Sequence, residues 1–359
     1  MAAGALSFVL IVKNKVIIQS IFLKNFRSYQ EREFSFSPRV NLILGPNAAG
    51  KTNLLEAIYL LFSGESFRAG KIEEMIKDKT TVAHIQGKVR KDGTKEDLKV
   101  VLSRGEINGH LVPRRQFLID ETKRSKRNFI GHFLAVIFRP EDLDIVIGSP
   151  SLRRRFLDEV LMGVDNEYYR SLLSYQKGLR ARNRVLESIR EGKTTIQSLF
   201  FWDRLLIKNG ELITQKREAL IEFLNGNKAT GSSLKINYLK NIISPQRLAE
   251  KQKAEIGAGM SLVGPHRDDF VILKNGWSLF SYGSRGEQRL GVFWLKMGQL
   301  SFWQEKTKEK PVLLLDDIFS ELDESHQEAV FAVLQAGQVI IAATAKPSFL
   351  DSKTEVIKI

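Results

Sequence analysis

The chain has 359 residues, no cysteine, and 55 Lys and Arg against 41 Asp and Glu, which gives a formal net charge of +14. With 43% hydrophobic and 27% charged residues, it is typical of a globular protein with about two structural units. The missing cysteines exclude a disulfide scaffold, cysteine-ligated metal sites and a thiol nucleophile. The positive charge favours a polyanionic partner such as nucleic acid. The alternative is that the net charge only keeps the protein soluble.

Two apolar runs near the N-terminus have the hydrophobicity of an export signal or membrane anchor, but their charges favour strands. Lys13 and Lys15 lie between the runs, whereas a membrane-spanning helix needs about 20 largely uncharged residues. A secretory signal carries its positive charge before the apolar stretch, not inside it. We therefore expect no membrane segment and a cytoplasmic protein, with residues 1–15 as an N-terminal extension.

The first part of the chain reads as strands, one helix and a hairpin-rich arm. Strands are predicted by the apolar and β-branched runs at residues 16–23, 31–38 and 40–44. Residues 52–62 carry apolar side chains at helical spacing and predict an amphipathic helix. Turn signals at residues 91–94 and at Asn108-Gly109 predict two hairpins in the arm that follows.

Helical patterns dominate the middle of the chain, and alternating elements return after it. Residues 150–225 predict long helices. The later elements are strands near 234–239 and 261–273, a helix from Ser284, a buried strand at 312–315, a helix after Asp323 and a strand at 338–343. Two α/β segments, 16–149 and 256–359, therefore flank a helical block at 150–255.

The positive charge is unevenly distributed along the chain. Residues 1–150 and residues 151–255 each carry a net charge of +8, whereas residues 256–359 carry −2. The densest basic cluster consists of Arg114, Arg115, Lys123, Arg124, Lys126, Arg127, Arg153, Arg154 and Arg155. A run of charge is usually a solvated face, so no single residue of this cluster is by itself a strong candidate for touching a phosphate.

The clearest chemical motif is a phosphate-binding loop. Residues 45–52, GPNAAGKT, match G-x-x-x-x-G-K-[ST] at every fixed position and lie between a predicted strand and a predicted helix. In such a loop the backbone N–H groups and the helix N-terminus bind phosphate, the lysine reaches the β- and γ-phosphates, and the hydroxyl ligates Mg²⁺. The predicted nucleotide contacts are Gly45, Pro46, Asn47, Ala48, Ala49, Gly50, Lys51, Thr52 and Asn53.

Two carboxylates after the strand at 312–315 supply the acidic part of such a site. We expect Asp316 to hold Mg²⁺ and Asp317 to orient or deprotonate the attacking water. The alternative is that Asp317 only caps a helix. Lys51 and Asp316 are 265 positions apart, so the two α/β segments must assemble into one nucleotide-binding lobe, with the helical block inserted between them.

A further motif begins at Gly283. Ser284, followed three residues later by Glu287, forms a capping box, which is a structural explanation of the motif. The functional alternative is a second phosphate-binding helix N-terminus, with Ser284 and Gly286 closing over the nucleotide of a partner protomer.

Together these motifs resemble those of the ABC-type ATPases. Residues 45–52 are similar to their Walker A motif, 312–317 to Walker B, 284–288 to the signature motif and 320–323 to the D-loop. Within that superfamily the chain resembles the RecF family. The stretches that carry this resemblance are LKNFRSY (23–29), GPNAAGKTNLLEAIYLL (45–61), SPSLRRRFLDE (149–159), LVGPHRDDF (262–270), GSRGEQRL (283–290) and LLLDDIFSELD (313–323).

The resemblance implies an α/β fold, namely an ABC-type P-loop ATPase head with a mixed sheet, an antiparallel arm and an inserted helical second lobe. Residues 16–149 and 256–359 would form the two halves of the head, and residues 150–255 the helical lobe. It also implies ATP and Mg²⁺ as cofactors, an ATP-dependent homodimer and slow, DNA-stimulated ATP hydrolysis. Single-stranded, duplex or gapped DNA and the proteins RecR and RecO are the implied partners, in recombinase loading, replication maintenance and SOS induction.

The resemblance also assigns roles to individual residues. Asp317, Lys51 and Ser284 take the catalytic positions. Ser284, Gly286 and Glu287 meet the partner's nucleotide, Asp323 lies at the dimer seam, and Arg27 and Ser28 contact nucleotide. The candidate DNA contacts are Arg68, Arg114, Arg115, Lys123, Arg124, Lys126 and Arg127.

Three departures from the superfamily pattern affect these expectations. Asp317 stands where most members have Glu, which predicts slow hydrolysis, and Thr344 stands where transporters have a switch histidine. No Q-loop glutamine is evident, so residues 138–141 are the candidate coupling segment. Two alternatives stay open: the head of another SMC or ABC-type ATPase, and a nucleotide-switched DNA-binding scaffold with negligible turnover. His266 has no second ligand nearby in sequence, and we expect it to be hydrogen-bonded and structural.

Overall fold

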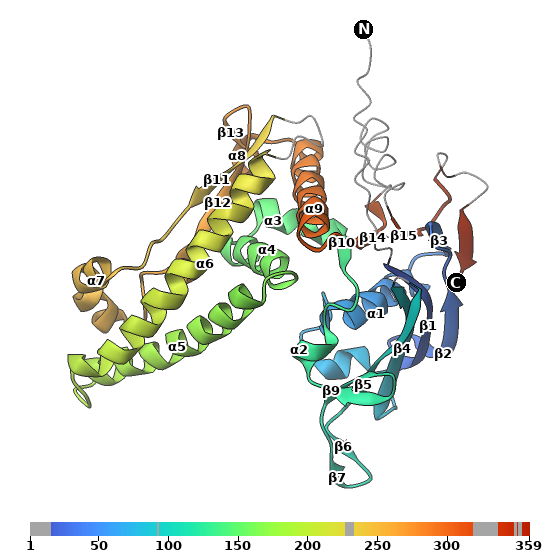
Figure 1. Cartoon of the computed structure of the whole chain (residues 1–359), viewed down its shortest axis with the longest axis horizontal. Coiled ribbons are helices and arrows are strands. Elements are labelled where there is room, and N and C mark those ends of the chain that lie inside the picture. Colours follow the sequence, from blue (N-terminus) through green and yellow to red (C-terminus); the bar gives the residue numbers. More distant parts are fainter. Residues whose placement is uncertain (1–15, 92, 227–232, 319–336, 348–349, 351–353) are drawn as a thin grey trace. The chain divides into compact units, whose positions relative to one another are not determined.

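The computed structural model describes residues 16–91, 93–226, 233–318, 337–347, 350 and 354–359 (Figure 1). The chain divides into two compact units. The first combines residues 1–140 with residues 303–359, and the second consists of residues 141–302. The second unit extends on both sides beyond the helical block expected at 150–255, because flanking segments pack on the same helices and small sheet.

The first unit contains a five-stranded parallel sheet in the order β10-β14-β15-β3-β16. Its strands are β3 (Val40–Leu44), β10 (Ala135–Phe138), β14 (Val312–Asp316), β15 (Val339–Ala343) and β16 (Glu355–Lys358). Every residue of β10, β14 and β15 is buried, which explains why these segments are unbroken apolar runs. The strands predicted at 312–315 and 338–343 are confirmed to within one residue.

The arm of the first unit is a six-stranded antiparallel sheet in the order β2-β1-β4-β5-β8-β9. Its strands are β1 (Val16–Phe26), β2 (Tyr29–Ser35), β4 (Val82–Lys91), β5 (Thr94–Ser103), β8 (Arg115–Ile119) and β9 (Thr122–Arg124). A small hairpin joins β6 (Glu106–Ile107) to β7 (His110–Leu111). Both predicted hairpin turns are confirmed, since each lies between two paired strands. The short helices of this unit are η1 (Ile72–Met75) and α2 (Lys126–Phe129).

The helix α1 (Lys51–Ser63) contacts strands of both sheets. Its apolar residues Leu54, Leu55, Ile58 and Leu61 are buried, as the helical spacing predicted. At Gly87 of β4 the helix comes so close that a Cβ atom would lie 2.5 Å from Cδ1 of Leu61. The absence of a side chain at this position therefore lets α1 pack directly on the antiparallel sheet.

The second unit is built on a pair of long, contacting helices, α5 (Asn166–Arg190) and α6 (Phe200–Gly226) (Figure 1). The other helices are η2 (Pro140–Leu143), α3 (Asp144–Ile147), α4 (Pro150–Met162), η3 (Ile196–Leu199), α7 (Pro245–Ala258), η4 (Pro265–Arg267), α8 (Leu279–Tyr282) and α9 (Arg285–Thr307), with the last residues of α9 in the first unit. The predicted helical block is confirmed. No helix within the described ranges is both long and apolar enough to cross a membrane.

A small antiparallel sheet of β11 (Leu234–Leu239), β12 (Asp269–Lys274) and β13 (Trp277–Ser278) completes the second unit. The prediction for 234–239 is confirmed, whereas the strand predicted at 261–273 is wrong in its first part. Residues before 269 do not join the sheet, because their polar groups bind the helices. The Ser261 N–H donates to Asn183 at 2.9 Å, and Gly264, with φ +129°, has no room for a Cβ beside the Tyr175 hydroxyl.

Buried ion pairs join the helices of the second unit. Arg217 of α6 is 2% exposed and contacts Asp158 at 2.7 Å and Asp268 at 2.9 Å. Arg182 of α5 pairs with Asp203 and with Glu255 of α7, each at 2.7 Å. Each arginine pairs with one fully buried carboxylate, Asp268 or Glu255, and with one partly exposed carboxylate, Asp158 or Asp203. The two arginines therefore link the helices that carry these groups.

His266 is hydrogen-bonded on both ring nitrogens, which confirms the structural role expected for it. Nδ1 lies 2.8 Å from the Tyr175 hydroxyl, and Nε2 lies 3.1 Å from the Ser261 carbonyl oxygen. Burial lowers the pKa of His266 to about 4, so the ring is neutral at pH 7.

Candidate phosphate-binding site

The loop between β3 and α1 has the backbone geometry that wraps a phosphate. Ala48 (φ 63°) and Gly50 (φ 107°) adopt left-handed conformations, and α1 begins at the next residue, Lys51. A Cβ at Gly50 would lie 3.0 Å from both Ser28 Oγ and the Tyr29 hydroxyl oxygen. Gly50 is therefore required twice, by its φ angle and by the chain that lies against it.

Lys51 is folded onto this loop. Its side-chain Nζ donates to the carbonyl oxygens of Gly45 and Pro46, each at 2.8 Å, and the residue is 7% exposed. The ammonium group thus lies inside the curve of the loop. An anion there would meet a fixed positive charge as well as the backbone N–H groups at the start of α1.

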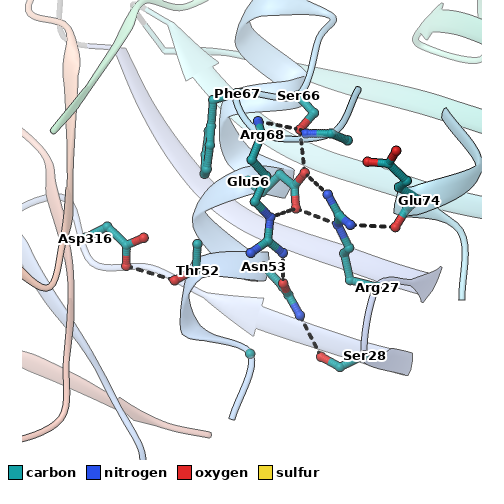
Figure 2. Close-up of polar contacts among 12 residues, drawn as sticks. Arg27, Ser28, Thr52, Asn53, Glu56, Ser66, Phe67, Arg68, Glu74 and Asp316 are labelled. Carbon is teal, nitrogen blue, oxygen red and sulfur yellow. Dashed lines mark hydrogen bonds and ion pairs between the residues drawn. The ribbon is translucent and has the colours of Figure 1, made fainter. Parts of the chain in front are cut away.

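Thr52 and Asp316 bring the two separated motifs together. The Thr52 hydroxyl donates to Asp316 Oδ1 at 3.1 Å, although 264 positions separate them in sequence (Figure 2). Asp316 is buried at the carboxyl end of β14. A hydroxyl and a carboxylate are the hard oxygen ligands that Mg²⁺ prefers, so the donor set fits the expected metal.

Asp317 lies next to this pair in an unusual backbone conformation. Its φ is 48°, and its N–H donates to the Ala342 carbonyl oxygen at 3.0 Å. A helix N-cap residue has an extended backbone instead. The backbone of Asp317 therefore argues against the capping alternative.

A network of polar side chains lies beside the first turns of α1 (Figure 2). Arg27 donates to Glu56 through Nε at 2.8 Å and through a terminal nitrogen at 2.6 Å. Asn53 donates to Ser28 Oγ at 2.9 Å and accepts from Arg68. Arg27, Ser28, Asn53 and Arg68, all predicted contacts of nucleotide or DNA, are thus brought together on one side of α1.

The signature-like segment belongs to the second unit and forms the capping box. The Ser284 N–H donates to Glu287 Oε2 at 2.8 Å, and the Glu287 N–H donates to Ser284 Oγ at 3.3 Å. Hydrogen bonds from Lys274 and Ser284 lower the pKa of Glu287 to about 2. A Cβ at Gly286 would meet no atom within 4 Å. The role of this helix end towards a partner's nucleotide stays a prediction.

Thr344 and the candidate coupling segment 138–141 lie among the described residues, whereas the D-loop does not. Asp323 lies outside the described residues, as do the rest of 320–323 and the helix predicted after it. Thr344 is exposed just after β15. In the candidate coupling segment the Arg139 guanidinium lies 4.6 Å from the centre of the Phe67 ring and donates to the Phe67 carbonyl oxygen at 3.3 Å.

The basic cluster separates into paired and exposed side chains. Arg114 pairs with Glu73 and Lys126 with Glu65. Arg115 donates to the Gly64 carbonyl oxygen at 2.5 Å, and burial lowers its pKa. By contrast, Lys123, Arg124 and Arg127 of this cluster are exposed and have no acidic partner among the described residues.

Arg153 and Arg154 join α4 to residues 268–269, whereas Arg155 is an exposed side chain paired on its own helix. Arg153 makes two hydrogen bonds with Asp269, at 2.6 and 3.0 Å. Arg154 donates to the Asp268 carbonyl oxygen at 2.8 Å, and Arg155 pairs with Glu159 on the same helix at 2.8 Å. All three have protein acceptors.

Sequence reasoning missed two residues beside the loop. The Tyr29 hydroxyl donates to the Gly50 carbonyl oxygen at 3.0 Å, and burial raises its pKa to about 12. Glu56 is fully buried on α1. The available signal was a single carboxylate inside the apolar run LLEAIYLL, which requires a partner if that face is buried.

Comparison with known proteins gives one consistent result. The family model described as RecF/RecN/SMC N terminal domain matches residues 17–359. "DNA replication and repair protein RecF" from Lachnoclostridium phytofermentans is 33% identical, over 96% of this chain and 97% of that protein. The protein of the same name from Caldanaerobacter subterraneus subsp. tengcongensis is 36% identical, over 92% of this chain and 94% of its own length.

Solved structures agree with the sequence matches. The structure of the recombination mediator protein RecF-ATP in the RecFOR pathway superposes with a TM-score of 0.84, at 34% identity and over 94% of each chain. With the two sheets and the helical second unit, this confirms the predicted fold class, an ATPase head with a helical insertion.

Proposed function

The chain belongs to the RecF family of DNA replication and repair proteins, and on that premise we propose that it binds ATP with Mg²⁺ and uses the bound nucleotide to control its grip on DNA. The observation that carries this proposal is the 3.1 Å hydrogen bond from Thr52 to Asp316, which joins the phosphate loop to the acidic strand end. The RecF structure described as an ATP complex supports the choice of nucleotide.

The phosphate groups would be held by the loop residues at 45–52. Backbone N–H groups at the start of α1 would donate to phosphate oxygens, and Lys51 would exchange its bonds with Gly45 and Pro46 for bonds with phosphate. Thr52 and Asp316 would hold Mg²⁺, which would neutralise charge on the β- and γ-phosphates. Asp317 would orient the water that attacks the γ-phosphorus and accept its proton.

Slow hydrolysis follows from the choice of Asp at this position. The Asp carboxylate is one methylene shorter than that of Glu, and its backbone is held at φ 48°. The shorter side chain would reach less far towards an attacking water. The same observation favours a second candidate function, a nucleotide-switched DNA-binding scaffold with negligible turnover.

We place the switch in an ATP-dependent homodimer. Ser284, Gly286 and Glu287 of one protomer would meet the γ-phosphate bound by the other, with Asp323 at the seam. The capping box uses the N–H groups of Ser284 and Glu287. The other backbone N–H groups at the start of α9 would be the donors for this contact. Closing the dimer would then bring basic surfaces of both protomers to DNA.

DNA binding would use the phosphate backbone of single-stranded, duplex or gapped DNA. The exposed Lys123, Arg124 and Arg127 are the foremost contacts, because they need not leave an acidic partner within the described part of the chain. Arg68, Arg114, Arg115 and Lys126 are contacts only if their present bonds exchange. The pathway in the name of the related RecF structure supports RecR and RecO as partners in recombinase loading at gaps, and we extend the proposal to SOS induction.

One set of measurements tests the proposal. Nucleotide and DNA binding are measured for the wild type and Lys51→Met, with and without Mg-ATP. We expect Lys51→Met to lose ATP binding and the ATP-dependent part of DNA binding, because the loop then lacks its fixed cation. ATP-independent DNA affinity that equals the ATP-bound value in the wild type would contradict the switch.

Turnover with saturating DNA separates the two candidates. The control variant is Asp317→Asn, which keeps the size of the side chain and removes its charge. We expect the wild type to hydrolyse ATP faster than this variant. Equal rates would establish the scaffold in place of the slow ATPase.

A further inference from the structure

A carboxylate is buried in the helix that carries the phosphate loop. Glu56 lies four residues after Thr52 on α1, among buried apolar residues, and is 0% exposed. An ionised carboxylate in such a place is strongly unfavourable unless donors surround it. Glu56 therefore must be matched by its partners, and these come from outside the helix.

Four donor contacts converge on the two oxygens of Glu56 (Figure 2). Arg27 donates from Nε to Oε2 at 2.8 Å and from a terminal nitrogen to Oε1 at 2.6 Å. Arg68 Nε donates to Oε2 at 3.1 Å, and the Ser66 hydroxyl donates to Oε1 at 2.5 Å. Each oxygen accepts two hydrogen bonds, so the orientation of the carboxylate is fully determined.

These contacts tie three separate segments of the chain together. Arg27 lies in the turn between β1 and β2, and its remaining nitrogen donates to the Glu74 carbonyl oxygen at 2.6 Å. Ser66 and Arg68 lie in the loop after α1. Two guanidinium groups against one carboxylate leave a net positive charge beside the first turns of α1. Glu56 thus gathers cations and also limits where they can point.

A relay leads from this cluster to the phosphate loop. Arg68, oriented by Glu56, donates to the side-chain oxygen of Asn53. The Asn53 amide nitrogen then donates to Ser28 Oγ at 2.9 Å. Ser28 Oγ in turn lies 3.0 Å from the place that a Cβ of Gly50 would take. Arg68 fixes the orientation of the Asn53 amide, and the Asn53 amide nitrogen then donates to Ser28. This chain of hydrogen bonds holds the Ser28 hydroxyl oxygen beside the loop.

We propose that Glu56 is a positioning residue of the phosphate site, a role that rests on the function proposed above. By fixing Arg27 and Arg68, and through Asn53 the Ser28 hydroxyl, it preorganises the polar groups that adjoin the phosphate loop. A triphosphate then binds to groups that are already ordered, so binding involves a smaller loss of side-chain conformational entropy. Glu56 itself does not touch the nucleotide.

The first test compares phosphate affinity in matched Glu→Gln variants. Binding of Mg-ATP and of inorganic tripolyphosphate is measured by calorimetry for the wild type, Glu56→Gln and Glu31→Gln. Glu31 pairs with Lys24 on the exposed face of the arm, so its variant is the control. We expect Glu56→Gln to weaken both ligands about tenfold, the size of one charged hydrogen bond, and Glu31→Gln to change neither. A folded Glu56→Gln with wild-type affinity overturns the proposal.

The second test follows the relay and keeps the buried carboxylate, in case Glu56→Gln does not fold. Asn53→Ala, Ser28→Ala and the double variant form a cycle that leaves Glu56 and both arginines in place. If the relay positions Ser28, the losses of tripolyphosphate affinity are non-additive. The double variant then binds tripolyphosphate as well as the single variant that has the lower affinity. Additive losses overturn the relay. Thermal unfolding of each variant separates this coupling from a change in stability alone.

Lys51→Met distinguishes failure of this inference from failure of the proposed function. If the wild type binds Mg-ATP and Lys51→Met does not, the phosphate site stands, and a wild-type result for Glu56→Gln refutes only the positioning role. If the wild type itself binds neither ligand, the proposed function fails, and the role of Glu56 in it fails too.

Discussion

At the scale of single residues, the protein uses buried polar groups as fixed points. Glu56, Arg182 and Arg217 are each nearly or fully buried, and each is matched by opposite charges from other elements. Removing one member of such a set leaves an uncompensated charge and is far more harmful than losing a surface pair. These residues define a structure in which few alternative packings are tolerated.

His266 gives this scale a pH prediction. Its folded pKa of about 4 lies below the unfolded value, so the unfolded chain binds the proton more readily. Stability from this residue is fully present above about pH 6.5 and is lost as the pH falls towards 4, by about 3 kcal/mol in total. His266→Gln, which can keep a bond to Tyr175, should flatten this dependence. Urea unfolding at pH 7, 5.5 and 4.5 measures the free energy of unfolding of both proteins. The same pH dependence in the wild type and in His266→Gln would contradict the role given to His266.

At the scale of elements, the phosphate loop depends on how α1 is held. The helix begins at Lys51 and packs on both sheets of the first unit. Its position is set on one side by the apolar strands of the parallel sheet and on the other by the close approach at Gly87. A shift of α1 would move Thr52 away from Asp316, so packing far from the loop is part of the site.

Gly87→Val tests this dependence. The added side chain would collide with Leu61, and overpacking of this kind costs about 1–3 kcal/mol of stability. We expect a lower melting temperature together with weaker Mg-ATP binding in the fraction that stays folded. Gly70→Ala is the control, because a Cβ there meets no atom closer than 3.9 Å. Unchanged ATP affinity in a destabilised Gly87→Val would show that the helix keeps its place.

The sequence predicted elements well where one local pattern decides the structure. The strand predicted at 312–315, the loop at 45–52 and the turn at Asn108-Gly109 follow from apolar runs and glycine positions that allow few conformations. It failed at 261–268, where apolar residues resemble a strand but contacts with α5 and α6 hold the chain in another form. The role of Glu56 was not predicted for the same reason, because it depends on contacts between distant parts of the chain. A carboxylate on a helix is expected to face solvent unless its partners are known.

At the scale of the whole molecule, the distribution of positive charge favours phosphate-backbone contacts for the proposed DNA binding. Within the basic cluster, Arg114, Arg115 and Lys126 have acidic or carbonyl acceptors, whereas Lys123, Arg124 and Arg127 are exposed and have no acidic partner among the described residues. Contacts of this kind neutralise phosphates without reading bases, so they contribute affinity that salt removes.

The triple variant Lys123→Gln, Arg124→Gln, Arg127→Gln should bind DNA more weakly and with a shallower salt dependence. Each lost phosphate contact lowers the slope of log affinity against log salt by about 0.9 on duplex DNA. We expect a decrease of up to about 3 in the slope, with Lys24→Gln, a paired surface cation, as the control. Fluorescence anisotropy across a salt series gives the slopes, and identical slopes would remove these residues from the interface.

The pairing of β3 also has a consequence for how the protein is made. This strand, which leads into the phosphate loop, lies between β15 and β16, which begin only at Val339 and Glu355. Residues 141–302, by contrast, form a compact unit from one uninterrupted stretch. On the ribosome the inserted unit can therefore fold before β15 and β16, the strands that pair with β3, have been synthesised. A nascent chain therefore lacks Asp316 and the complete five-stranded sheet until translation is nearly finished.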